Sequence, residues 1–105
     1  MSKFCVVLVT IPKGKPAEKL ARLLLQQKLV ACVNSIRSVQ SLYWWQGKIE
    51  SSNETLLILK TQISRFKKLS DFIQKNHPYR LPEILALPIQ KGSASYLNWI
   101  EKSLR

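Results

Sequence analysis

Residues that carry most enzyme chemistry are scarce in this chain of 105 residues. It contains one histidine, His77, two cysteines and six acidic residues. No nucleophile and base stand at a catalytic spacing, and no cofactor motif is present, so we do not expect an enzyme. Cys5 and Cys32 lie in apolar segments without a C-x-x-C spacing, which is typical of reduced, buried thiols in a cytoplasmic protein.

Long apolar runs are also missing. No stretch approaches the roughly 20 apolar residues of a membrane helix, so we expect no membrane partner. The apolar run near the N-terminus has no small-residue cleavage pattern after it and is better interpreted as a buried strand than as a signal peptide. The length predicts one domain, spanning residues 1–105.

Acidic residues are few beside 17 lysines and arginines, which gives a net charge of +11. A charge of this size is compatible with a nucleic-acid partner. The basic residues, however, recur along the whole chain, whereas a binding surface requires clustering. This distribution favours an ordinary solvated surface.

What the sequence does contain is a succession of periodic segments. Gln46-Gly47 forms a tight turn between the two middle strands. The order β-α-β-β-α-β, followed by a helix, predicts an α+β ferredoxin-like sandwich with an extended central hairpin and a short C-terminal helix. Strands are predicted over residues 3–11, 31–45, 48–61 and 81–90, and helices over 16–29, from an N-cap at Ser64 to His77, and from an N-cap at Ser93 to Leu104.

Three features predict an oligomer. Cys5–Val9 and Leu56–Leu59 are apolar on both faces, although the helices of this fold cover only one. The hairpin strands are each about 14 residues long, against a usual five or six, so the hairpin extends beyond its own domain. Pro88 cannot donate to a β-ladder, so its strand should lie at a sheet edge or contain a bulge where subunits meet.

The hairpin tip carries three consecutive aromatic residues. In a strand, Tyr43 and Trp45 point to one face and Trp44 to the other. One subunit cannot cover both faces so far from its core. We therefore expect Tyr43, Trp44 and Trp45, like Pro88, at the oligomer interface.

Five motifs in one order together resemble the CutA family of divalent-cation tolerance proteins, from Val6 to Arg105. The resemblance implies a ferredoxin-like subunit in a tight homotrimer, a copper or divalent-metal tolerance function, and no established reaction. The motifs are Ala31-Cys32-Val33-Asn34, Tyr43-Trp44-Trp45-x-Gly47-Lys48-Ile49, Leu59-Lys60-Thr61, His77-Pro78-Tyr79-x-x-Pro82-Glu83 and Gly92-x-x-x-Tyr96-Leu97-x-Trp99.

The resemblance also implies copper or another divalent cation as a ligand. A bacterial relative binds metal through a cysteine on the first strand and two histidines before Pro-Tyr, positions held here by Val9, Asn76 and His77. Of these three side chains only His77 is a usual metal ligand, and Cys32 and Glu83 are the other candidates. The candidates for a cleft between subunits are Cys32, Lys60, His77, Tyr79 and Glu83.

Two other functions share this element order. PII-like sensors are trimers that bind nucleotides between subunits, but Lys13-Gly14-Lys15 lacks the spacing of a phosphate-binding P-loop. RNA-recognition domains stack bases on aromatics of the central strands. Here Phe4 is the only aromatic of the first strand and residues 48–61 contain none. We therefore do not expect a nucleic-acid partner, and a small-molecule ligand stays unassigned.

Overall fold

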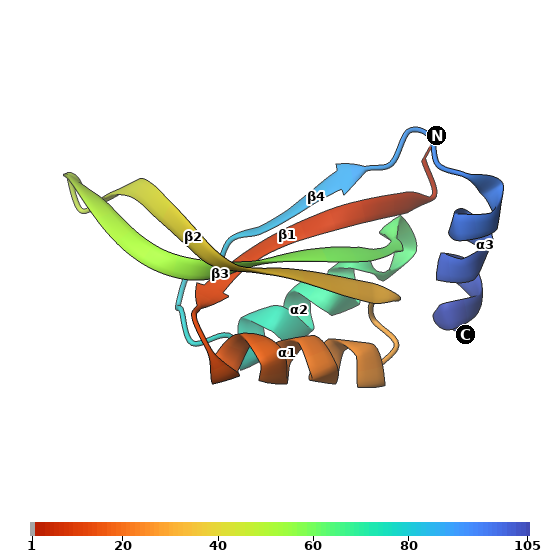
Figure 1. Ribbon diagram of the computed structural model, residues 1–105, viewed down its shortest axis with the longest axis horizontal. Coiled ribbons are helices and arrows are strands. Elements are labelled where there is room, and N and C mark those ends of the chain that lie inside the picture. Colours follow the sequence, from red (N-terminus) through yellow and green to blue (C-terminus); the bar gives the residue numbers. More distant parts are fainter. Residues whose placement is uncertain (1) are drawn as a thin grey trace.

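The computed structural model describes residues 2–105. Its four strands form one antiparallel sheet in the order β2-β3-β1-β4 (Figure 1). This is the predicted α+β ferredoxin-like order with an additional C-terminal helix. The elements are β1 (Phe4–Pro12), α1 (Lys15–Gln26), β2 (Cys32–Trp45), β3 (Lys48–Gln62), the 3-10 turn η1 (Ile63–Arg65), α2 (Phe66–Asn76), β4 (Ile84–Pro88) and α3 (Ala94–Ser103).

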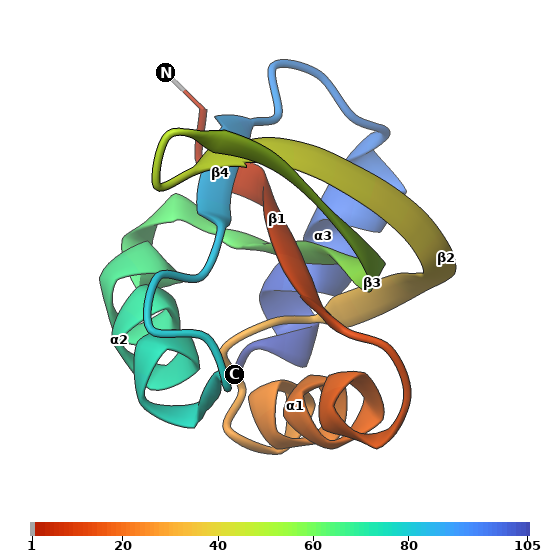
Figure 2. The same cartoon turned by 90° about the vertical axis from the view of Figure 1, so that its left-hand side faces the viewer.

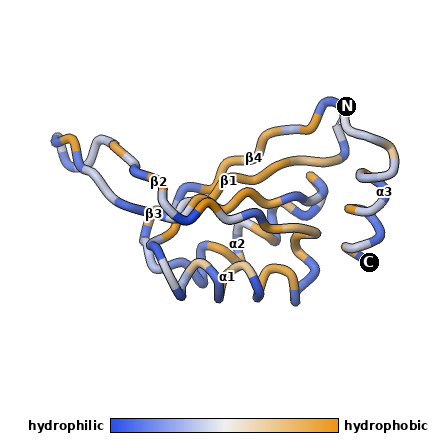
Figure 3. The backbone as a smooth tube through the Cα atoms, in the orientation of Figure 1, coloured by the Kyte–Doolittle hydropathy of each residue, from blue (hydrophilic) through white to orange (hydrophobic). Residues whose placement is uncertain are grey.

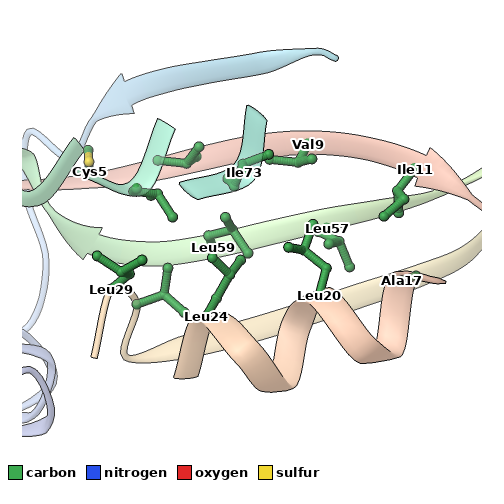
Figure 4. Packing of buried hydrophobic residues seen from close by; sticks show 13 residues of the cluster. Cys5, Val9, Ile11, Ala17, Leu20, Leu24, Leu29, Leu57, Leu59 and Ile73 are labelled. Carbon is green, nitrogen blue, oxygen red and sulfur yellow. The ribbon is translucent and has the colours of Figure 1, made fainter. Parts of the chain in front are cut away.

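Helices α1 and α2 lie next to each other on one face of the sheet (Figures 1 and 2). Between them and the strands is the main core, shown in Figure 4. Alternate residues of β1 and β3, such as Val7, Val9 and Leu59, are completely buried there against Leu24 of α1 and Ile73 of α2. Each such side chain contributes about 1.5–3 kcal/mol through burial. In the described part of the chain, no helix is long and apolar enough to span a membrane.

Helix α1 ends three residues earlier than predicted, because Lys28 adopts a left-handed conformation with φ 58. The Leu29 N–H donates to the Leu24 carbonyl and the Lys28 N–H to the Leu25 carbonyl, which together form a Schellman motif. Leu29 is still buried beside Leu24. Leu29 therefore continues the apolar spacing of α1 although it lies beyond the end of the helix, because it packs into the same core.

The predicted N-cap at Ser64 is wrong, since Ser64 lies inside the turn η1 and α2 begins without a side-chain cap. Tertiary contacts fix this corner instead. The Ile63 N–H donates to the Lys3 carbonyl, and the Arg65 guanidinium donates to the carbonyls of Lys28 and Leu104. The other predicted N-cap, Ser93, is confirmed, because its hydroxyl accepts the Tyr96 N–H.

Strand β4 lies at an edge of the sheet, as Pro88 predicts, and Pro88 is its last residue. The strand is shorter than the predicted residues 81–90, because Pro82 precedes its paired part and Pro88 ends it.

The hairpin of β2 and β3 extends well past the two helices (Figure 1). Gln46 and Gly47, with φ 49 and 78, form the predicted tight turn, in which both residues need positive φ. The register shifts between Ile36 and Val39, where β2 holds one residue more than β3. Beyond this bulge Val39 stands opposite Glu54.

The face of the sheet opposite the helices is apolar and largely uncovered. The register places Val6, Leu8 and Ile58 on this open face, together with Leu85 and Leu87, which are 56% and 48% exposed. Figure 3 shows the hydrophobic character of β1 and β4. Helix α3 covers only the end near Phe4, away from the hairpin tip. The expected two-faced apolar sheet is confirmed, and such a face is rare in a soluble monomer.

Candidate functional site

The predicted site residues fall into two groups at different ends of the open face. His77, Tyr79 and Glu83 lie near Glu54, where the hairpin leaves the sheet, whereas Cys32 lies beside Lys60. At about 3.3 Å per residue, β3 spans roughly 20 Å between Glu54 and Lys60. Each group therefore has to be considered separately within one chain.

The first group is organised around Glu54, whose residue is only 4% exposed. The Tyr79 hydroxyl donates to Glu54 Oε2 over 2.8 Å. Burial, and then the hydrogen bond and charge of Glu54, raise the pKa of Tyr79 to about 12. Tyr79 is therefore a neutral donor that holds a buried carboxylate in place.

His77 uses both ring nitrogens within this group. Its Nδ1 accepts the Tyr79 N–H over 3.0 Å, so Nε2 carries the proton and donates to the Thr10 carbonyl over 2.7 Å. Burial lowers the pKa of His77, against the opposing effects of the Thr10 bond and the Glu54 charge. As a neutral imidazole, His77 ends α2 and ties the following loop to β1.

We expect stability to fall as the pH drops below 6.5, the ordinary pKa of histidine. Because burial lowers the pKa of His77 in the folded state, the unfolded chain takes up a proton first. The stability that neutral His77 contributes is fully present above pH 6.5. It is lost as the pH falls towards the pKa of His77 in the folded state. Urea unfolding from pH 7.5 to 5.5 should give a shallower pH dependence for His77→Gln, and identical slopes would contradict the assignment.

Glu83 faces the same space as Glu54. Burial, and then the charge of Glu54, raise the pKa of Glu83. The two carboxylates line a groove of about 830 Å³ that also contains the aromatic residues of the hairpin. Its lining is Thr10, Gln40, Ser41, Leu42, Tyr43, Trp44, Trp45, Glu54, Pro78, Tyr79, Arg80, Leu81 and Glu83.

The second group contains the partly buried thiol of Cys32. The Lys60 ammonium donates to Cys32 Sγ over 3.8 Å. Burial, and then the charge and hydrogen bonding of Cys32, raise the pKa of Tyr96. The expected burial of both cysteines is thus correct for Cys5, whose thiol pKa is raised by burial, but only in part for Cys32.

The structure does not bring the predicted metal ligands His77, Cys32 and Glu83 together in one chain. Residues 2–105 contain no group of three or more His, Cys, Asp or Glu side chains that could hold a metal ion. At the family ligand positions, Val9 faces the core, and the Asn76 amide donates to the Phe72 carbonyl. A metal site that uses these candidates therefore needs ligands from more than one subunit.

The predicted interface residues are accessible in the single chain. Trp44 is 73% exposed, Trp45 49% and Tyr43 41%, and Pro88 lies exposed at the edge of the sheet.

Sequence reasoning missed Glu54, the most buried acidic residue of the group. A signal was present, because this glutamate lies two residues before the apolar run Leu56–Leu59, inside a strand. A charged residue at such a position is rarely buried without a partner.

Comparisons with known proteins agree over almost the whole chain. The family described as CutA1 divalent ion tolerance protein matches residues 5–103. "Protein CutA, chloroplastic" of Arabidopsis thaliana is 45% identical, covering 95% of this chain and 55% of that protein, so the chain spans about half the length of this relative.

Two further matches cover nearly all of both chains. The divalent-cation tolerance protein CutA of Thermus thermophilus is 41% identical, over 93% of this chain and 95% of that protein. The crystal structure of CutA1 from Oryza sativa superposes with a TM-score of 0.95 at 40% identity, covering 99% of this chain and 95% of that one. The chain therefore belongs to the CutA1 family of divalent ion tolerance proteins.

Proposed function

We propose that this chain acts in divalent-cation tolerance as a non-catalytic homotrimer in the cytoplasm, where its two free cysteines would stay reduced. The observation that carries the proposal is the open apolar face, with Leu85 and Leu87 about half exposed. A three-fold ring joins two different patches of the same chain, so opposite ends of this face can meet across each boundary.

Such a ring supports a metal site shared between subunits. Cys32 lies towards one end of the open face and Glu83 beyond the other end, so neighbouring copies could bring a thiol and a carboxylate together. Thiolate suits copper, and a carboxylate adds a charged oxygen ligand. His77 would have to give up one of its two hydrogen bonds to join them. We therefore propose weak binding of copper or another divalent cation.

The non-catalytic part of the proposal is supported by how the reactive groups are used. Both nitrogens of His77 make structural hydrogen bonds, and the Tyr79 hydroxyl donates to Glu54. These groups are committed to holding the loop before β4.

Metal titration tests the shared site. For protein purified without a histidine tag, we expect Cys32→Ser and Glu83→Gln each to lower the affinity for Cu²⁺ at least tenfold, as measured by calorimetry with Zn²⁺ titrated in parallel. Each variant removes one charged ligand. Glu50→Gln, which removes an exposed glutamate of the hairpin, is the control. Unchanged Cu²⁺ affinity in both ligand variants would reject the site.

A second candidate function is a nucleotide sensor like the PII proteins. A second groove, of about 870 Å³, lies beside the start of α1 and the end of α2. Lys15, Lys19, Arg22 and Lys75 line it, which favours an anionic ligand. A thermal-shift screen with adenine nucleotides separates this function from metal binding.

A further inference from the structure

The acidic residues of this chain are distributed unequally between ion pairs and the groove under the hairpin. Glu18, Asp71 and Glu101 form salt bridges with Arg22, Lys67 and Lys3. Glu50 lies exposed on the hairpin. The remaining two, Glu54 and Glu83, line the same groove, and within residues 2–105 neither has a cationic partner within 4.0 Å. Although the chain has 17 lysines and arginines, neither of these two carboxylates is paired with one of them in the part of the chain that the structure describes.

Glu54 is the more informative of the two carboxylates. Its residue is 4% exposed, and only Oε2 has a hydrogen-bond partner, the Tyr79 hydroxyl. No fully buried side-chain oxygen or nitrogen of residues 2–105 lacks a partner, so Oε1 must keep some contact with solvent, and Glu54 lines the groove. A nearly buried carboxylate with one unpaired oxygen is costly unless a donor reaches it.

The walls of the groove show which kind of donor fits. Tyr43, Trp44, Trp45 and Tyr79 line it beside the carboxylates, and the register places Tyr43 on the same face of the hairpin as Glu54. Aromatic faces attract ammonium and guanidinium groups and also cover alkyl chains. A bare divalent cation needs more oxygen ligands than two carboxylates supply, and residues 2–105 hold no larger cluster.

We propose that this groove binds a small organic cation with N–H donors, a primary ammonium or a guanidinium. Glu54 Oε1 and the Glu83 carboxylate accept its hydrogen bonds, and the aromatic residues cover its carbon chain. The site uses residues of one chain and involves neither Cys32 nor a metal ion. It shares Glu83 with the proposed metal site, so Cys32→Ser, which removes a ligand of the metal site alone, distinguishes the two sites.

Arg80 is the cation nearest in sequence to this site, and it also lines the groove. Its guanidinium forms no ion pair with Glu54 or Glu83 within 4.0 Å. Its positive charge opposes a cationic ligand, so Arg80→Gln should tighten binding. If Arg80 itself were the occupant, its removal would expose the site and raise the affinity much more than the severalfold change expected from lost repulsion.

Calorimetric titration of the full-length protein tests the proposal, with n-butylammonium and ethylguanidinium as probes, and n-butanol as the uncharged control of similar shape. We expect at least one cationic probe to bind at least tenfold more tightly than butanol. Glu83→Gln should weaken that binding at least tenfold, because it removes an accepting charge. Glu50→Gln and Cys32→Ser should leave it unchanged.

A second set of variants guards against loss of folding. Glu83 is exposed, so Glu83→Gln should keep the wild-type thermal melt. Tyr79→Phe keeps the ring but removes the donor to Glu54 Oε2, and it should change probe affinity less than Glu83→Gln. The proposal is overturned if folded Glu83→Gln binds the probe like wild type, if butanol binds equally well, or if no probe binds at millimolar concentration. It is also overturned if Arg80→Gln raises the affinity by orders of magnitude.

Discussion

Trp44→Ala and Trp45→Ala are each expected to weaken assembly strongly. The wild-type protein should sediment as three chains at micromolar concentration or below. Both tryptophans protrude from the hairpin, with exposed fractions of 73% and 49% in the single chain, beyond the reach of its own core. If a neighbouring subunit buries them, truncation costs about 3–5 kcal/mol per site. A closed ring of three subunits has three equivalent interfaces, so the loss occurs three times.

Sedimentation equilibrium and thermal melts over a concentration series measure this effect. Leu25→Ala is a suitable control, because Leu25 is 40% exposed on α1, which belongs to the helix layer on the other face of the sheet. Wild-type assembly and melting in both tryptophan variants would disprove an interface role. A variant that stays trimeric and heat-stable but loses a bound small molecule would show that the aromatic residues serve ligand binding in the groove and not the interface.

Leu59→Ala is expected to lower the free energy of unfolding by about 2–5 kcal/mol. Leu59 is completely buried in the core between the sheet and the helices, so its truncation leaves a cavity (Figure 4). Leu81→Ala removes the same atoms from a residue that is 76% exposed, and its effect should stay within about 0.5 kcal/mol.

Urea unfolding at one fixed protein concentration gives both values, because the apparent stability of an oligomer depends on concentration. Equal losses in Leu59→Ala and Leu81→Ala would mean that the helix-covered face is not the core.

The element order could be predicted because local signals determine it. Gln46-Gly47 provides the positive φ values of the turn, and Pro88 restricts its strand to an edge. Boundaries were less predictable where distant contacts decide them. Ser64 looks like an N-cap in sequence, but Arg65 bonds to the carbonyls of Lys28 and Leu104, which a local pattern cannot reveal.

The candidate site, too, could be predicted only where its residues are close in sequence. His77, Tyr79 and Glu83 are close in sequence and meet near one groove, so a motif could group them. Their contact with Glu54 depends on how β3 is placed beside β1, and the separation of Cys32 depends on the register of β2 with β3. These pairings bring together residues more than 20 positions apart, and single-sequence periodicity contains no information about them.

The bulge between Ile36 and Val39 decides which residues of the hairpin tip share a face with Glu54. Side chains alternate along a strand, so the extra residue in β2 inverts the alternation from Val39 to Trp45 relative to Cys32–Ile36. A single-codon deletion of Ser38 would remove this extra residue and leave Val39 opposite Glu54, so Tyr43 and Trp45 would keep their face. Such a deletion should change only the bend of the hairpin, and with it the angle at which the aromatic tip leaves the sheet.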